Sequence, residues 1–128
     1  MLRRAVAGDI QGIQKLIESN PETILRRSTE ELRELIGCFW VMEEEGEVVG
    51  CACLDVYSSK IAEVRTVIVR ADRQGLGYGS DLVRAAVTEA KSMHIHEILV
   101  VTSFPKYFER LGFGSCLNEK YALFWVGD

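Results

Sequence analysis

The chain is poor in the features that mark membrane, secreted and metal-binding proteins. Its 128 residues contain no apolar run long enough to cross a membrane and no signal peptide, so we expect a cytoplasmic protein without a membrane partner. The four cysteines form no CxxC pair and both histidines lie far from them in sequence, so we expect reduced thiols and no metal site. Acidic residues outnumber basic ones by 19 to 15, and the net charge of −4 argues against a nucleic-acid partner.

What is present is the composition of one globular domain. Hydrophobic residues make up 48% and charged residues 27% of the chain, and no linker, repeat or low-complexity tract divides it. We therefore expect a single domain over residues 1–128. The apolar runs and helical stripes predict the order β-α-α-β-β-β-α-β-α-β. This order indicates an α/β fold with a mixed central sheet and helices on both faces.

Local signals in the first half of the chain place its elements. Asp9 can cap a first helix, and Ser28 and Glu31 have the spacing of a capping box at the start of a second. Residues 38–57 predict two strands that are joined by a solvated acidic turn at Gly46.

The second half carries the remaining elements. The nearly continuous apolar run over 61–70 predicts a central strand, and residues 81–91 have the apolar stripe of a helix. Residues 97–102 predict a buried strand, and Pro105 can start a short helix that ends before Gly112. Residues 120–126, "KYALFWV", predict a closing strand, apolar enough to pair across a homodimer.

A glycine-rich loop separates the central strand from the long helix. In "RQGLGYGS", Gly75, Gly77 and Gly79 stand at alternate positions. Backbone N–H groups at such a strand–loop–helix junction form a nest for anions. A Walker loop is excluded because the segment has no lysine, and a Rossmann fingerprint fails because its third glycine would fall on Ser80. An ordinary glycine-rich turn is the alternative to a phosphate site.

Gln74, Gly77 and Gly79 match a third pattern, Gln/Arg-x-x-Gly-x-Gly/Ala. This pattern resembles the pyrophosphate loop of the GNAT N-acetyltransferases, which bind acetyl-CoA, and the likeness continues from "AEVRTVIVR" to "KYFERLGF". Within this family the chain is most similar to the acetyltransferase domain of N-acetylglutamate synthase, in "LRRSTEELRELIGCFWV" and "EVVGCACL" as well. The arginines that this domain carries near its C-terminus have no counterpart after Arg110.

The resemblance implies acetyl-CoA as co-substrate and a set of residues that hold it. Strand backbone groups would bind the pantetheine arm and the acetyl group, and the loop would bind the phosphates. The strand positions are Val67, Ile68 and Val69. The loop positions are Gln74, Gly75, Leu76, Gly77, Tyr78, Gly79 and Ser80.

Glu63 is the candidate catalytic base, because it occupies the glutamate that removes the amine proton in some family members. The two-residue period of a strand predicts that Glu63, Arg65, Val67 and Val69 share one face. The alternative is a solvated carboxylate, or one paired with Arg65.

Candidates for the acid are weaker. The usual family tyrosine is replaced by Phe108, and the adjacent Tyr107 points about 100° away, which suits packing or substrate contact. Cys51, which shares a face with Cys53, is either a substrate-side residue that could act as the acid or a small buried hydrophobe. The thiolate can also leave unaided.

Arginines suggest the acceptor. Arg27 and Arg65 can bind carboxylates through bidentate forks, or they can be surface arginines that balance the acidic segments. Arg26 is expected on the surface. We therefore expect acetyl transfer to the amine of a small acceptor, with glutamate first, and by the resemblance a role in arginine biosynthesis. A protein lysine or N-terminal acetyltransferase and a non-catalytic sensor of acetyl-CoA or an amino acid are the alternatives.

Overall fold

The computed structural model describes residues 1–22, 24–117 and 120–127, and its centre is a mixed five-stranded sheet in the order β1-β2-β3-β4-β5. The first four strands are antiparallel neighbours, and the fifth joins β4 in parallel. They are β1 (Leu2–Arg4), β2 (Phe39–Glu44), β3 (Glu47–Val56), β4 (Ile61–Val69) and β5 (Glu97–Leu99). The α/β fold with a mixed sheet is thereby confirmed.

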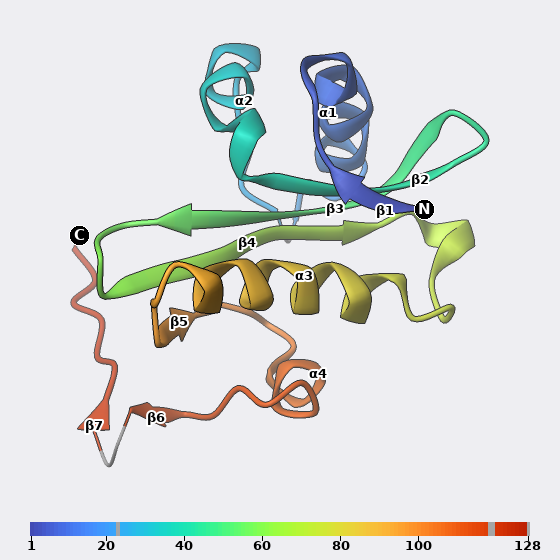
Figure 1. The fold of residues 1–128 in the computed structure, drawn as a ribbon. Helices are drawn as coiled ribbons and strands as arrows, with labels where there is room; N and C mark the ends of the chain where they lie inside the picture. The colour runs from blue at the N-terminus through green and yellow to red at the C-terminus, as the bar shows by residue number, and fades with distance from the viewer. Residues whose placement is uncertain (23, 118–119, 128) are drawn as a thin grey trace.

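Helices cover both faces of this sheet (Figure 1). On one face lie α1 (Ile10–Glu18) and α2 (Thr29–Leu35), and on the other lie α3 (Tyr78–Ser92) and α4 (Pro105–Glu109). Three short 3₁₀ segments cover Ala7–Asp9, Ile36–Cys38 and Ala71–Arg73. None of the helices in the described ranges is long and apolar enough to cross a membrane.

The expected helix caps are partly confirmed. Ser28 accepts the Glu31 N–H at 3.1 Å, and Glu31 accepts the Ser28 N–H in return, as in a capping box. Asp9 occupies the N-cap position of α1, but its side chain makes no capping hydrogen bond there. Its carboxylate instead accepts hydrogen bonds from the Val6 N–H at 2.8 Å and from Arg3 at 2.8 and 2.9 Å. Asp9 binds Arg3 rather than the N–H groups of α1 because an ionised donor forms the stronger hydrogen bond.

Each face of the sheet has its own core. Ile13, Leu16, Leu32 and Phe39 pack under α1 and α2 together with both cysteines of β3, Cys51 and Cys53. On the other face, the buried stripe of α3 packs against β3, β4 and α4. That stripe consists of Leu82, Val83, Ala86 and Ala90. The two cores hold the sheet between helices and fix which strand residues face which side.

A bulge in β4 reverses this facing halfway along the strand. Cys51 pairs with Ile68 but Cys53 pairs with Arg65, so two steps on β3 match three on β4. Thr66 takes up the extra residue with a φ of 54°, which a β-branched residue rarely adopts. The register shift moves every later side chain to the opposite face.

The expectation of one common face for Glu63, Arg65, Val67 and Val69 was therefore wrong. Before the bulge, Ala62 and Val64 pack in the α3 core, which leaves Glu63 and Arg65 on the α1–α2 face. After it, Val67 and Val69 pack on the α3 side, and Ile68 packs in the α1–α2 core. A strict two-residue period could not predict this switch, because the bulge depends on pairing with β3.

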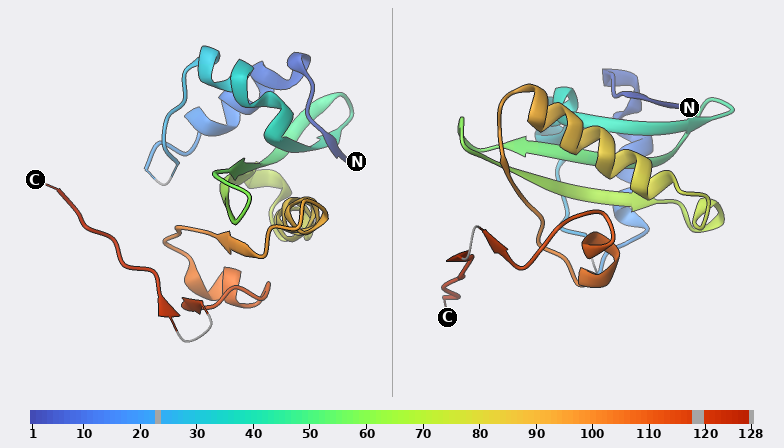
Figure 2. Two further views of the ribbon diagram at one scale, coloured as in Figure 1. Left: turned by 60° about the vertical axis from the view of Figure 1, so that its left-hand side comes forward. Right: turned by 60° about the horizontal axis from the view of Figure 1, so that its bottom comes forward.

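The end of the chain differs from the expected closing strand. β5 ends at Leu99, and the described residues near the C-terminus form only a separate two-stranded sheet of β6 (Cys116–Leu117) and β7 (Lys120–Tyr121). Residues 122–127 have no regular structure and form an extended segment at the margin of the fold (Figure 2), with Leu123 90% and Trp125 91% exposed. The apolar pattern signals strand propensity but supplies no hydrogen-bonding partner. Pairing of this stretch across a dimer stays a prediction.

Candidate functional site

The loop between β4 and α3 has the backbone of an anion nest. Gly75 and Gly77 have φ angles of 82° and 88°, which side chains rarely tolerate. Apart from the adjacent residues, no described residue has a heavy atom within 4 Å of where their Cβ atoms would be. Gly77 is the N-cap of α3, and its carbonyl accepts the Asp81 N–H at 3.0 Å. The N–H groups of the first turn before Asp81 therefore have no acceptor within the helix. Gly75 and Gly77 themselves place no side chain in the path of an anion that approaches these groups.

The third glycine has a different cause. A Cβ on Gly79 would lie 2.7 Å from the Tyr107 hydroxyl and 3.6 Å from Cγ2 of Val69. The same hydroxyl lies 3.3 Å from Oγ of Ser80. Gly79 therefore admits the α4 side chain to the first turn of α3. Tyr107, which the sequence suggested for packing or substrate contact, lies beside the loop.

Phe108 confirms that the usual tyrosine position belongs to the core here. It is 7% exposed and contacts the rings of Tyr107 and Phe113 edge to face, with centroids 5.1 and 5.7 Å apart.

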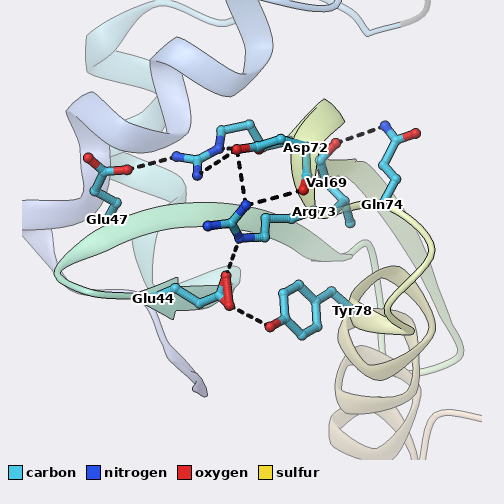
Figure 3. Close-up of polar contacts among 8 residues, drawn as sticks. Glu44, Glu47, Val69, Asp72, Arg73, Gln74 and Tyr78 are labelled. Carbon is cyan, nitrogen blue, oxygen red and sulfur yellow. Dashed lines mark hydrogen bonds and ion pairs between the residues drawn. The ribbon is translucent and has the colours of Figure 1, made fainter.

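Side chains on both flanks tie the loop to the sheet (Figure 3). Gln74 donates from Nε2 to the carbonyl of Val69 at 3.0 Å. Arg73 and Tyr78, which flank the loop, both donate to Glu44 at the end of β2, each at 2.6 Å. The Glu44 contacts were not foreseen, because the acidic turn looked only solvated from the sequence.

The strand before the loop is open on one edge. β4 pairs with β5 only from Ile61 to Glu63, and β5 ends at Leu99. From Val64 to Val69, the stretch that contains the three predicted cofactor positions, β4 has no strand partner on that side among the described residues. Free backbone groups next to an anion nest favour a ligand that carries both amide and phosphate groups.

On the α1–α2 face of the sheet, the bulge in β4 brings charged side chains together. Asp55 lies 3.1 Å from Arg65 Nη1 and 3.6 Å from Arg27 Nη2, measured to its Oδ2. Arg27 also donates from Nε to the hydroxyl of Thr66 at 3.2 Å. Arg27 is 7% and Asp55 8% exposed, yet Nη2 of Arg27 has no hydrogen-bond partner among the described residues. A buried, unused guanidinium donor is costly unless a ligand accepts from it.

Arg27 also borders a cavity of about 390 Å³ between α1 and the start of α2. Arg26 and Gln14 line the same cavity, and Oε1 of Gln14 is the second buried polar atom that has no partner among the described residues. Arg26 itself is exposed, as expected.

Glu63 lies at the outer end of this charged group. It is opposite Asp55 across β3 and β4, and it accepts a hydrogen bond from the hydroxyl of Tyr57. Burial, followed by the bond to Glu63, raises the pKa of Tyr57. Neither Asp55 nor Tyr57 was among the sequence-predicted residues. The sequence signal that could have indicated Asp55 is its position two residues after Cys53, as an aspartate in an otherwise apolar strand. The two segments opposite this strand both carry arginines.

Cys51 has the surroundings of a core residue. It is 0% exposed, and its thiol donates to the carbonyl of Thr66 at 3.3 Å. Burial raises its pKa to about 12, so the thiol is neither a nucleophile nor a strong acid at neutral pH. We therefore assign Cys51 to packing. In the ranges that the structure describes, no three His, Cys, Asp or Glu side chains are grouped to hold a metal ion.

Comparisons with known proteins identify the class. The Acetyltransferase (GNAT) family profile matches residues 10–113. An amino-acid acetyltransferase of Mycobacterium tuberculosis is 32% identical over 117 residues, which cover 88% of this chain and 67% of the relative. An amino-acid acetyltransferase of Proteus mirabilis is 34% identical over 116 residues, which cover 88% of this chain but only 26% of that longer protein.

Two solved structures agree with the sequence comparison. Rv2747 from Mycobacterium tuberculosis, in complex with CoA and NLQ, has a TM-score of 0.87 and 30% identity over 91% of this chain and 73% of that one. N-acetylglutamate synthase from Neisseria gonorrhoeae, complexed with coenzyme A and N-acetyl-glutamate, has a TM-score of 0.82 and 28% identity over 86% and 27%. The chain belongs to the GNAT acetyltransferase family and is an acetyl-CoA-dependent acetyltransferase. The predicted resemblance is confirmed.

Proposed function

We propose that the enzyme transfers the acetyl group of acetyl-CoA to the amine of a small acceptor that carries a carboxylate, with glutamate as the first candidate. The buried guanidinium of Arg27 carries this proposal, because its Nη2 has no hydrogen-bond partner among the described residues and only an ion pair with Asp55 at 3.6 Å. A carboxylate is the ligand that best matches an arginine fork, and its binding would remove the cost of the unused donor. Arg65, 30% exposed in its side chain, can supply a second donor from the same face.

The relatives support an amino-acid acceptor. The mycobacterial and Proteus relatives are named amino-acid acetyltransferases, and the Neisseria structure contains N-acetyl-glutamate. The expected role in arginine biosynthesis depends on the same acceptor, so a different acceptor would contradict it.

The donor side of the proposed site uses the loop and the open strand. Backbone N–H groups from Gln74 to Ser80 would hold the pyrophosphate, assisted by the dipole of α3. The unpaired edge of β4 at Val67, Ile68 and Val69 would orient the pantetheine arm and the acetyl carbonyl. Acetyl-CoA supplies the activated thioester. Tyr107, whose hydroxyl lies by Ser80, would contact this side rather than the acceptor.

The acceptor side uses the α1–α2 face. Arg27 and Arg65 would orient the acceptor through its carboxylate, and Glu63, on the same face, would take the proton that the amine loses as it attacks the carbonyl. The new bond forms between the amine nitrogen and the acetyl carbon, and the carbon–sulfur bond breaks. The thiolate leaves without a side-chain acid, because Phe108 is in the core and the Cys51 thiol is buried.

A paired substitution tests the acceptor site. Arg27→Ala removes the buried fork, whereas Arg26→Ala removes an exposed arginine from the adjacent position. Free-thiol release should give a kcat/KM for glutamate that falls ~10- to 100-fold in Arg27→Ala, mainly through KM. Arg26→Ala should stay close to wild type. Equal effects of the two substitutions would contradict a carboxylate contact at Arg27.

A further inference from the structure

We propose that Glu44 is a positioning residue that holds both ends of residues 74–77, the part of the phosphate loop that precedes α3, from outside the site. The inference rests on the proposed cofactor role of that loop, but it concerns a residue that need not touch the ligand. Glu44 is the last residue of β2 and belongs to the β2–β3 hairpin, far from the loop in sequence.

The geometry is that of a two-point clamp (Figure 3). Nε of Arg73 donates to Oε1 of Glu44 at 2.6 Å, and the hydroxyl of Tyr78 donates to Oε2 at 2.6 Å. Arg73 directly precedes the loop segment 74–77, and Tyr78 directly follows it. One carboxylate therefore bridges the two residues at which the loop begins and ends.

The clamp is anchored on both of its sides. Glu44 and Arg73 are partly buried, with side chains 28% and 34% exposed, and Tyr78 packs against the core cluster that contains Met42 and Leu82. A second pair of contacts continues the network, because Asp72 lies 3.1 Å from Arg73 and 2.7 Å from Arg70. Arg70 then reaches Glu47 of the same hairpin at 2.8 Å.

The loop needs such support because of its glycines. Gly75 and Gly77 give the segment more conformational freedom than any other residue would, and ordering it on binding would weaken affinity. Fixing both ends limits this freedom before the ligand arrives. The N–H groups at the start of α3 are then already aimed at the anion site.

Because Glu44 is negatively charged, the direction in which CoA affinity changes when the charge is removed distinguishes a positioning role from simple repulsion. A carboxylate near an anion site repels the anion, so a Glu44 without a positioning role should weaken CoA binding by its charge alone. Its removal would then strengthen binding. The clamp predicts the opposite, because loss of the bridge releases the loop.

Calorimetric titration with CoA compares Glu44→Gln with Glu45→Gln. Both substitutions remove one negative charge from the hairpin, but Glu45 is exposed and forms no hydrogen bond or ion pair with the described residues. We expect the Kd for CoA to rise ~10-fold in Glu44→Gln, and to stay within about twofold of wild type in Glu45→Gln. Unchanged or tighter CoA binding in Glu44→Gln would overturn the proposal.

Amide hydrogen exchange of the free protein gives a second readout. The amide of Asp81, which donates to the Gly77 carbonyl where the loop joins α3, should exchange faster in Glu44→Gln than in wild type or Glu45→Gln, while the α3 interior stays protected. Because no CoA is present, this result is independent of the cofactor assignment. Faster exchange with a wild type that fails to bind CoA would support the clamp and overturn the cofactor site, whereas equal exchange in all three proteins would overturn the clamp.

Discussion

The guanidinium of Arg27 and the carboxylate of Asp55 face each other at 3.6 Å, and both residues are more than nine-tenths buried. The same carboxylate lies 3.1 Å from Arg65. Asp55 is thus the shared counter-ion of the two arginines that we propose for the acceptor. Removal of this carboxylate would leave the Arg27 guanidinium as a buried charge whose one remaining polar partner, among the described residues, is Thr66.

Asp55→Asn should therefore destabilise the fold. Breaking a buried pair from one side costs about 3 kcal/mol or more, because the remaining charge is uncompensated. Urea unfolding of the purified protein measures this loss. Asp81→Asn, the same substitution on an exposed first turn of α3, is the control and should have a much smaller effect. A similar midpoint for the two variants would contradict the counter-ion role.

Gly79 should tolerate a methyl group only when Tyr107 loses its hydroxyl. The close approach of 2.7 Å predicts that Gly79→Ala destabilises by about 1–3 kcal/mol through overpacking. Tyr107→Phe in the same chain should restore most of that loss, since alanine is otherwise the better helix former. Thermal melting of the two single variants and the double variant measures the coupling. Additive effects would show that the hydroxyl is not the obstacle.

The loop and its contacts also show which features of the structure the sequence could predict. The capping box at Ser28 and the glycine loop at Gly75 and Gly77 were predictable because they depend on a few neighbouring residues. The approach of Tyr107 to Gly79 was not, because it depends on how α4 packs against α3. The pattern correctly located the third glycine but not the reason for it.

The charged face shows the same limit. Arg27 and Glu63 could be named from the sequence, but their relation could not, because the bulge at Thr66 reverses the facing of β4. Asp55 went unnoticed since a single aspartate at a strand end is usually solvated. At the exposed end of the chain, the sequence predicted too much structure. Its apolar residues indicated a strand, but they have no partner in the main sheet.

Glu63→Gln tests the base. Removal of a general base should lower kcat by ~10²-fold or more at neutral pH, while calorimetry should find CoA binding unchanged. The acidic limb of the pH–rate profile should also disappear. A variant that keeps this limb would point to another base or to deprotonation of the amine in solution.

Cys51→Ala separates packing from chemistry. Since the thiol is buried and has a pKa raised to about 12, it stays protonated and unreactive at physiological pH. We expect kcat within about twofold of wild type, together with a stability loss of about 1 kcal/mol from the smaller side chain. A thiol-reactive probe should also label native Cys51 slowly. A large fall in kcat with an intact fold would contradict the packing role and indicate that Cys51 takes part in catalysis.

The acceptor itself is the central claim, and free-thiol release from acetyl-CoA by the wild-type enzyme tests it most directly. The panel contains the twenty amino acids, several polyamines, and peptides with a lysine or a free N-terminus. We predict the highest kcat/KM for glutamate, with other acidic or amide amino acids next and carboxylate-free amines far below. A preference for polyamines or peptides would contradict the carboxylate-bearing acceptor, and CoA binding without turnover of any amine would favour a sensor.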